Sequence, residues 1–207
     1  MNINELYVLN RAIDGKDIFS LPALSELKIS DFLVESIKDG LIKKGILESY
    51  ETFTKEGAII TNRLRLFKEA KKHVIINDIS VGVINEDESV VFIYNPLIDD
   101  YKFIKIDTSE ATMQIFETCG FFPNMDKTNK INSDKRIVLS RNDFSKKYYL
   151  ESDNSLRLIA KSQDTVVDEV YFCADGKQYV YDYNENVLYE KTYEGIISHL
   201  SGRMSDS

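Results

Sequence analysis

Adjacent acidic residues are the first candidates for chemistry, because paired carboxylates can bind a hard cation or exchange protons. They occur at Asp99-Asp100, Glu86-Asp87-Glu88 and Asp168-Glu169. None of them has the alternating oxygen spacing of a calcium-binding loop. Each is expected in a turn or at the start of a strand, where a carboxylate is solvated. The sequence therefore predicts no metal site.

The remaining residue types that perform chemistry are few and scattered. His73 and His199 lie outside any HExxH or His/Cys pattern, and Cys119 and Cys173 have no CxxC partner. Structural or surface roles are expected for both histidines, and two buried, reduced thiols for the cysteines. The sequence contains no GxSxG, GxGxxG or GxxxxGK[ST] motif. We therefore expect a protein that is not an enzyme and that binds no cofactor.

Charge argues against a nucleic-acid partner. The chain has 207 residues and a formal net charge of −8, and an acidic surface repels a phosphate backbone. Residues 1–72 carry 12 Lys+Arg and 11 Asp+Glu, so the acidity lies almost wholly in the remainder, which has a charge of −9. No run is long and apolar enough to span a membrane, and no secretory signal begins the sequence. A cytoplasmic location is expected.

The N-terminal segment predicts three helices and a wing. Helices are expected at 3–14, at 31–44 after a Ser30 cap, and at 55–72 after a Thr54 cap. A short apolar strand lies between the last two helices, and the stretch Glu48 to Thr52 after it would form the wing. This is the order of elements in a winged-helix domain. The helix 31–44 displays several carboxylates and the wing has no Lys or Arg. This pattern favours protein contact over DNA reading.

Two antiparallel meanders are expected after residue 72. The first has strands near 73–76, 81–84, 89–94 and 101–106, and a helix at 108–119 follows. A polar stretch, 123–135, precedes the second, with strands near 147–150, 156–159, 170–173, 178–181 and 187–190. The hairpin signal Asp175-Gly176 lies within it, and a helix at 193–201 closes the chain.

Strands joined by hairpins exclude a doubly wound parallel sheet, which needs a crossover between successive strands. The predicted fold class is α+β, with winged-helix-like helices followed by antiparallel meanders and intervening helices. We expect one domain over residues 1–207, with possible halves at 1–122 and 136–203 joined by the polar loop 123–135.

Aromatic strand faces are the best candidates for partner binding. Tyr179, Tyr181 and Tyr183 share one strand face because side chains alternate with a period of two, and Phe92 with Tyr94 forms a smaller version. Such a face suits either a sheet that a helix covers or a surface that contacts another protein. Both interpretations stay open at this point.

The order of motifs resembles a known family. The segment ELYVLNRAIDGKDIFSLP, a helix carrying LIKKGIL, and TKEG opening a helix that runs into HVIIN and a meander are similar to EspG-type proteins of type VII (ESX/WXG) secretion loci, in their Firmicutes branch. The resemblance implies a quasi-two-fold α+β fold with a central antiparallel sheet. It also implies a cytoplasmic chaperone or adaptor that binds a helical secreted substrate of the WXG/LXG type. It assigns no site residue.

Two other functions are consistent with the same sequence. A transcriptional regulator would use residues 1–72 as a winged helix and the remainder as a sensor. An immunity protein would neutralise a secreted toxin, a role that an acidic globular binding protein also suits.

Overall fold

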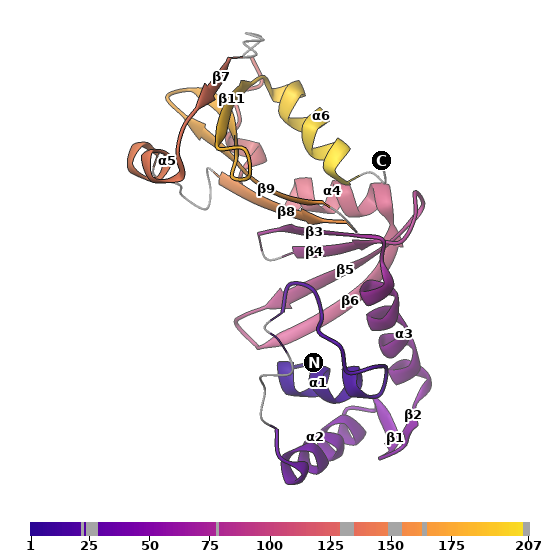
Figure 1. Cartoon of the computed structure of the whole chain (residues 1–207). Coiled ribbons are helices and arrows are strands. Elements are labelled where there is room, and N and C mark those ends of the chain that lie inside the picture. The colour runs from indigo at the N-terminus through magenta and orange to yellow at the C-terminus, as the bar shows by residue number, and fades with distance from the viewer. Residues whose placement is uncertain are drawn as a thin grey trace.

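The computed structural model describes residues 1–21, 23, 29–77, 79–128, 135–148, 155–162 and 165–204 (Figure 1). Its helices are α1 (Ile3–Arg11), α2 (Asp31–Lys43), α3 (Lys55–Glu69), α4 (Thr108–Thr118), α5 (Arg141–Lys147) and α6 (Tyr193–Met204), with a short 3-10 turn, η2 (Phe122–Asn124). Its strands are β1 (Leu47–Ser49), β2 (Thr52–Phe53), β3 (Lys72–Ile76), β4 (Ile79–Val83), β5 (Glu88–Asn95), β6 (Asp100–Asp107), β7 (Arg136–Val138), β8 (Ser155–Lys161), β9 (Val166–Ala174), β10 (Lys177–Asp182) and β11 (Val187–Lys191).

One antiparallel sheet of nine strands organises the molecule. Its order is β6-β5-β4-β3-β8-β9-β10-β11-β7, and β1 and β2 form a separate two-stranded hairpin. The first strands of the two meanders pair with each other, with Ile75 opposite Ile159. The sheet therefore continues across the junction of the possible halves 1–122 and 136–203.

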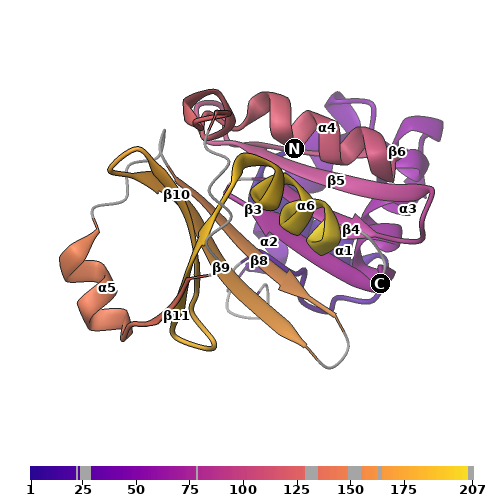
Figure 2. The same ribbon diagram turned by 90° about the horizontal axis from the view of Figure 1, so that it is seen from above.

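The two meanders are related by a quasi-two-fold arrangement. Each is followed by a helix, α4 or α6, and both helices cover the same face of the sheet, where they contact one another (Figure 2). Each is preceded by a helix, α3 or α5, that packs on the opposite face. We call these the α4/α6 face and the α3/α5 face. The α+β class with antiparallel meanders is thus confirmed.

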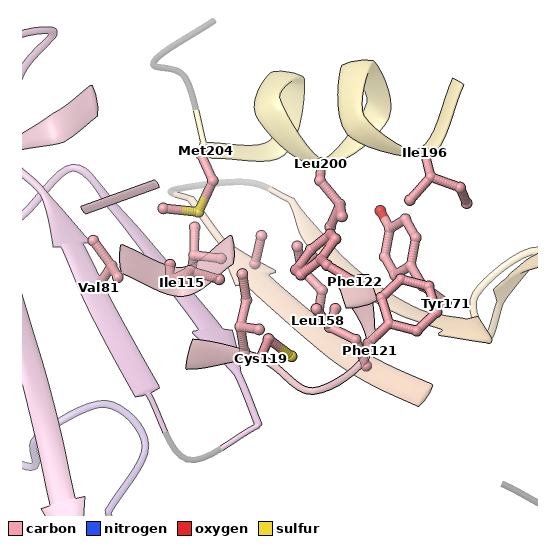
Figure 3. Close-up of a cluster of buried hydrophobic side chains, with 14 of the residues drawn as sticks. Val81, Ile115, Cys119, Phe121, Phe122, Leu158, Tyr171, Ile196, Leu200 and Met204 are labelled. Carbon is pink, nitrogen blue, oxygen red and sulfur yellow. The ribbon is translucent and has the colours of Figure 1, made fainter. Parts of the chain in front are cut away.

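The core on the α4/α6 face joins the two meanders. Strand residues such as Val81 and Leu158 are buried there under Ile115 of α4 and Leu200 of α6 (Figure 3). Phe121, at the turn that follows α4, is fully buried in the same core (Figure 3). Side chains alternate between the two faces of the sheet, so every second residue of these strands points into this core.

The opposite face has two separate cores. Under the N-terminal helices, Leu64 and Phe67 of α3 pack on Val90 and Phe92 of β5. Under α5, the buried residues are Phe144, Val170, Phe172, Tyr181 and Leu188.

The N-terminal helices begin at side-chain caps that the sequence predicts. Ser30 Oγ accepts a hydrogen bond from the Leu33 amide, and Thr54 Oγ1 accepts one from the Gly57 amide. Gly57 lies against the main chain that enters β1, because a Cβ atom there would stand 1.9 Å from the Ile46 carbonyl oxygen. The wing hairpin is thereby held close to the start of α3.

Several boundaries differ from the prediction. A helix, α5, ends at Lys147, where the sequence predicts a strand over 147–150, because Phe144 anchors this short segment in an aromatic core. Residues 149 and 150 lie outside the described residues. The edge strand β7 was not predicted, and part of the loop 123–135 (residues 129–134) is also outside the description. The Asp175-Gly176 turn is confirmed, with both residues at positive φ.

Candidate functional site

A groove lies between α1, α2 and the β1–β2 hairpin, at the lower end of the molecule in Figure 1. Its volume is about 350 Å³. Apolar side chains contribute most of the lining: Val8, Leu9, Ala12, Val34, Leu47 and Phe53. The other lining residues are Arg11, Asp31, Lys38, Tyr50 and Glu51. We call this the N-terminal groove.

Large apolar side chains are exposed on two of these three elements, α2 and the wing. Phe32 and Leu33, in the first turn of α2, are 83% and 41% exposed, and Tyr50 of the wing is 42% exposed. Phe32 and Leu33 are left outside because α2 turns Leu41 into the core and leaves Val34 and Ile37 half-buried. Exposed apolar residues on the elements that form an apolar groove are typical of a surface that binds a ligand or a partner.

Tyr50 forms part of the groove wall because α2 holds it in place. Its hydroxyl donates a 2.6 Å hydrogen bond to Asp39 Oδ1, and the Lys38 ammonium lies 5.6 Å from the centre of its ring. The hydrogen bond to Asp39 raises the pKa of the Tyr50 phenol, so the phenol stays a donor. The wing is thereby fixed against α2 on the open side of the groove.

Two basic residues of this segment are paired with carboxylates. Lys44 pairs with Glu5 at 2.8 Å, and Lys68 pairs with Asp14. The wing itself offers Glu48 and Glu51. A surface that binds DNA needs several free cations in one place, and the groove does not supply them.

Two of the five predicted contact residues belong to the core. Phe92 is 3% exposed and stacks on Phe103 with ring centres 4.6 Å apart. Tyr181 is fully buried, and its hydroxyl donates to the Leu139 carbonyl at 2.9 Å. For these two residues the partner-surface interpretation is corrected, because α3 covers Phe92 and α5 covers Tyr181.

The other three, Tyr94, Tyr179 and Tyr183, are half-buried. All five predicted residues lie on the α3/α5 face, but they divide between the two cores of that face. Phe92 and Tyr94 also line a pocket of about 220 Å³ that includes Leu21 and Ile75. Contact of these tyrosines with a partner stays a prediction.

A buried ionic cluster lies under α6, where the sequence predicted a solvated acidic pair. Glu169 lies inside β9 and its side chain is 2% exposed, so the solvated interpretation is wrong for this residue. Its carboxylate accepts hydrogen bonds from Tyr171 Oη at 2.6 Å and from Arg203 Nε at 3.3 Å, and His199 Nε2 lies 3.2 Å from it. The neighbouring Asp168 faces the other way and pairs with Arg157.

The hydrogen bonds of this cluster fix its charge state. Burial alone would raise the pKa of Glu169, but the bonds from His199, Arg203 and Tyr171 outweigh burial and lower that pKa to about 2. Burial and the Glu169 charge raise the pKa of Tyr171. A carboxylate that stays charged and is enclosed by hydrogen-bond donors is suited to holding α6 on the sheet. The signals in the sequence were the two-residue step from Glu169 to Tyr171 and the four-residue step from His199 to Arg203.

Other chemical sites are weak. Within the described residues, no group of three His, Cys, Asp or Glu side chains is placed to hold a metal ion. Cys119 and Cys173 are both free, and burial raises the pKa of each thiol. None of the described helices is both long and apolar enough to cross a membrane.

The comparisons with known proteins place this site within a family. No curated protein matches the chain. A family model described as a domain of unknown function (DUF5081) matches residues 1–130. The matched part includes the N-terminal groove, the first meander and α4. Since it covers more than half of the chain, the protein belongs to the DUF5081 family.

Proposed function

We propose that this protein is a non-enzymatic binding protein whose N-terminal groove holds the apolar side of a helical segment from another protein. The observation that carries the proposal is the exposure of Phe32 on α2, the helix that contributes Asp31, Val34 and Lys38 to the lining of the groove. Burying such a side chain on binding contributes about 2 kcal/mol. A groove with an apolar floor and single charges at its rim suits an amphipathic helix, whose apolar residues recur every three or four positions.

The resemblance to EspG-type proteins supplies the class of partner. Under this proposal the protein is a cytoplasmic chaperone or adaptor of type VII secretion, and the helical segment belongs to a secreted substrate of the WXG/LXG type. The quasi-two-fold sheet supports this proposal, since the same arrangement is what the resemblance implies.

Charge favours this role over that of a winged-helix regulator. The wing carries Glu48 and Glu51 and no Lys or Arg, and Lys44 of the preceding segment is paired with Glu5. Few Lys or Arg side chains are therefore available here to bind DNA phosphates and release their counterions.

The test is co-purification from cells that express the native gene locus. We expect the tagged protein to recover a small helical secreted protein, and the complex to survive gel filtration. Recovery of a folded toxin would assign the immunity function instead. Salt-sensitive binding to its own promoter, without a protein partner, would assign the regulator function. Recovery of neither a protein nor DNA would contradict the proposal.

A further inference from the structure

A second surface, separate from the N-terminal groove, lies on the outer side of α3. It is a shallow depression of about 540 Å³ at the edge of the sheet, beside β6. The residues that line it are Lys55, Ala58, Ile59, Asn62, Arg63 and Lys105. Three of these carry positive charge and none carries negative charge, although the whole chain has a net charge of −8.

The cations of this depression are only partly compensated. Lys105 pairs with Glu88 at 2.7 Å, and the carboxylate of Glu88 is partly exposed. Arg63 donates to the Phe103 carbonyl, a neutral acceptor that orients the guanidinium at the rim. Among the residues that the structure describes, neither Lys55 nor Arg63 lies within ion-pair distance of a carboxylate. Two full positive charges therefore face the depression.

An exposed apolar side chain lies between these charges. Ile59 is 43% exposed on the outer side of α3, one helical turn after Lys55 and one before Arg63. Residues at this spacing share one helix face. Part of the main chain of the neighbouring edge strand is already bonded, by Met1 at Tyr101 and by Arg63 at the Phe103 carbonyl. The side chains of α3 and Lys105 are therefore the main recognition groups of this surface.

We propose that this depression docks an acidic amphipathic segment of a partner protein, with an apolar side chain on Ile59 and carboxylates on Lys55 and Arg63. Charge complementarity supports this occupant, because a basic or neutral segment would gain nothing from the two cations. A protein is favoured over a nucleic acid because the depression contains no aromatic ring for base stacking and only three cations.

The test uses fluorescence anisotropy of a labelled helical peptide in which glutamates flank one leucine at i±4 spacing. A second peptide with glutamine at each glutamate serves as the control ligand. At low salt we expect the glutamate peptide to bind and the glutamine peptide not to bind. The affinity of the glutamate peptide should fall about tenfold when salt screens the charges. Lys55→Glu should abolish binding, and Ile59→Ser should weaken it several-fold. Lys146→Glu, an equal charge change on α5, should leave the affinity unchanged, as should Phe32→Ser, which follows the groove residue Asp31 on α2.

Five results would overturn the proposal. The first four are no binding of the glutamate peptide at low salt, equal binding of the glutamine peptide, an equal loss with Lys146→Glu, and tighter binding of a single-stranded oligonucleotide under the same conditions. Self-association that Lys55→Glu removes would identify a second copy of this chain as the occupant and would also overturn it. Because Phe32→Ser leaves this surface intact, a failure of this proposal can be distinguished from a failure of the function proposed for the N-terminal groove.

Discussion

Arg203, in the last turn of α6, forms an ion pair with the buried carboxylate of Glu169 in β9. The pair joins the closing helix to a strand of the second meander, and Tyr171 and His199 complete the shell around the carboxylate. It lies beside Ile196 and Leu200, which pack α6 on the sheet. Apolar burial and one ionic cluster therefore hold the helix that closes the core.

Replacing Glu169 should be costly. Glu169→Gln removes the charge that Arg203 pairs with; because Glu169 is buried but the Arg203 side chain is 34% exposed, the loss should be about 2 kcal/mol. Asp168→Asn is a matched control, because that neighbour pairs with the largely exposed Arg157 and should cost below about 1 kcal/mol. Urea denaturation of the wild type and the two variants measures the loss of unfolding free energy in each variant. Equal losses for the two variants would contradict a structural role for the buried pair.

The same cluster predicts a dependence on pH. The pKa of Glu169 is lowered to about 2 in the folded protein, against about 4.3 in an unfolded chain. The unfolded state therefore binds the proton more readily, and the stabilisation is complete above about pH 5 and is lost as pH falls toward 2. We expect the difference in unfolding free energy between wild type and Glu169→Gln to narrow between pH 5 and pH 2. A constant difference over that range would show that the pKa is not lowered.

Two glycines in helices should respond in opposite ways to alanine. Gly57→Ala would place a Cβ atom against the Ile46 carbonyl, which already accepts a hydrogen bond from the Thr54 amide, so about 3 kcal/mol should be lost. Gly202→Ala meets open space in α6 and should gain up to about 1 kcal/mol. Thermal unfolding checks both. A neutral Gly57→Ala would mean that the wing is not packed against α3.

The aromatic core under α5 should depend on one residue. The rings of Phe144 and Tyr181 stack 4.0 Å apart with planes 3° from parallel, and Phe144 is the buried residue of α5. Phe144→Ala should cost about 3 kcal/mol or more and free the α5 amides for hydrogen exchange. Ser145→Ala, on the exposed side of the same helix, should cost below about 1 kcal/mol. Unchanged protection of the α5 amides in Phe144→Ala would contradict this.

Hairpin signals and helix caps in the sequence predict most of the fold. The alternation in 89–94 and 101–106, and the Asp175-Gly176 turn, identify strands whose pairing is local. The pairing of β3 with β8 is not predictable in this way, because it joins residues more than 80 positions apart. Helix α5 escapes detection because RNDFSKK has one apolar residue and no period.

The sequence predicts the helices and the wing that form the candidate site, but it does not predict which of their side chains are exposed. Ser30 and the apolar spacing of residues 33–41 identify α2, yet they do not show which side chains α1 and the wing leave exposed. Likewise, the tyrosine alternation places Tyr181 on one strand face, but only the position of α5 shows that this face is covered. Side-chain exposure depends on tertiary packing that short sequence patterns do not encode.

The most direct test of the proposed function is the affinity of surface variants for the helical secreted protein that co-purifies with this chain. Phe32→Ser removes the exposed side chain that follows the groove residue Asp31 on α2, and Leu97→Ser removes one that is 92% exposed at the β5–β6 turn. Both should fold like wild type, as circular dichroism will show. Calorimetry should find that Phe32→Ser weakens binding roughly thirtyfold, equivalent to about 2 kcal/mol, while Leu97→Ser binds like wild type. Wild-type affinity in Phe32→Ser, or an equal loss in Leu97→Ser, would contradict the assignment of the N-terminal groove as the binding site.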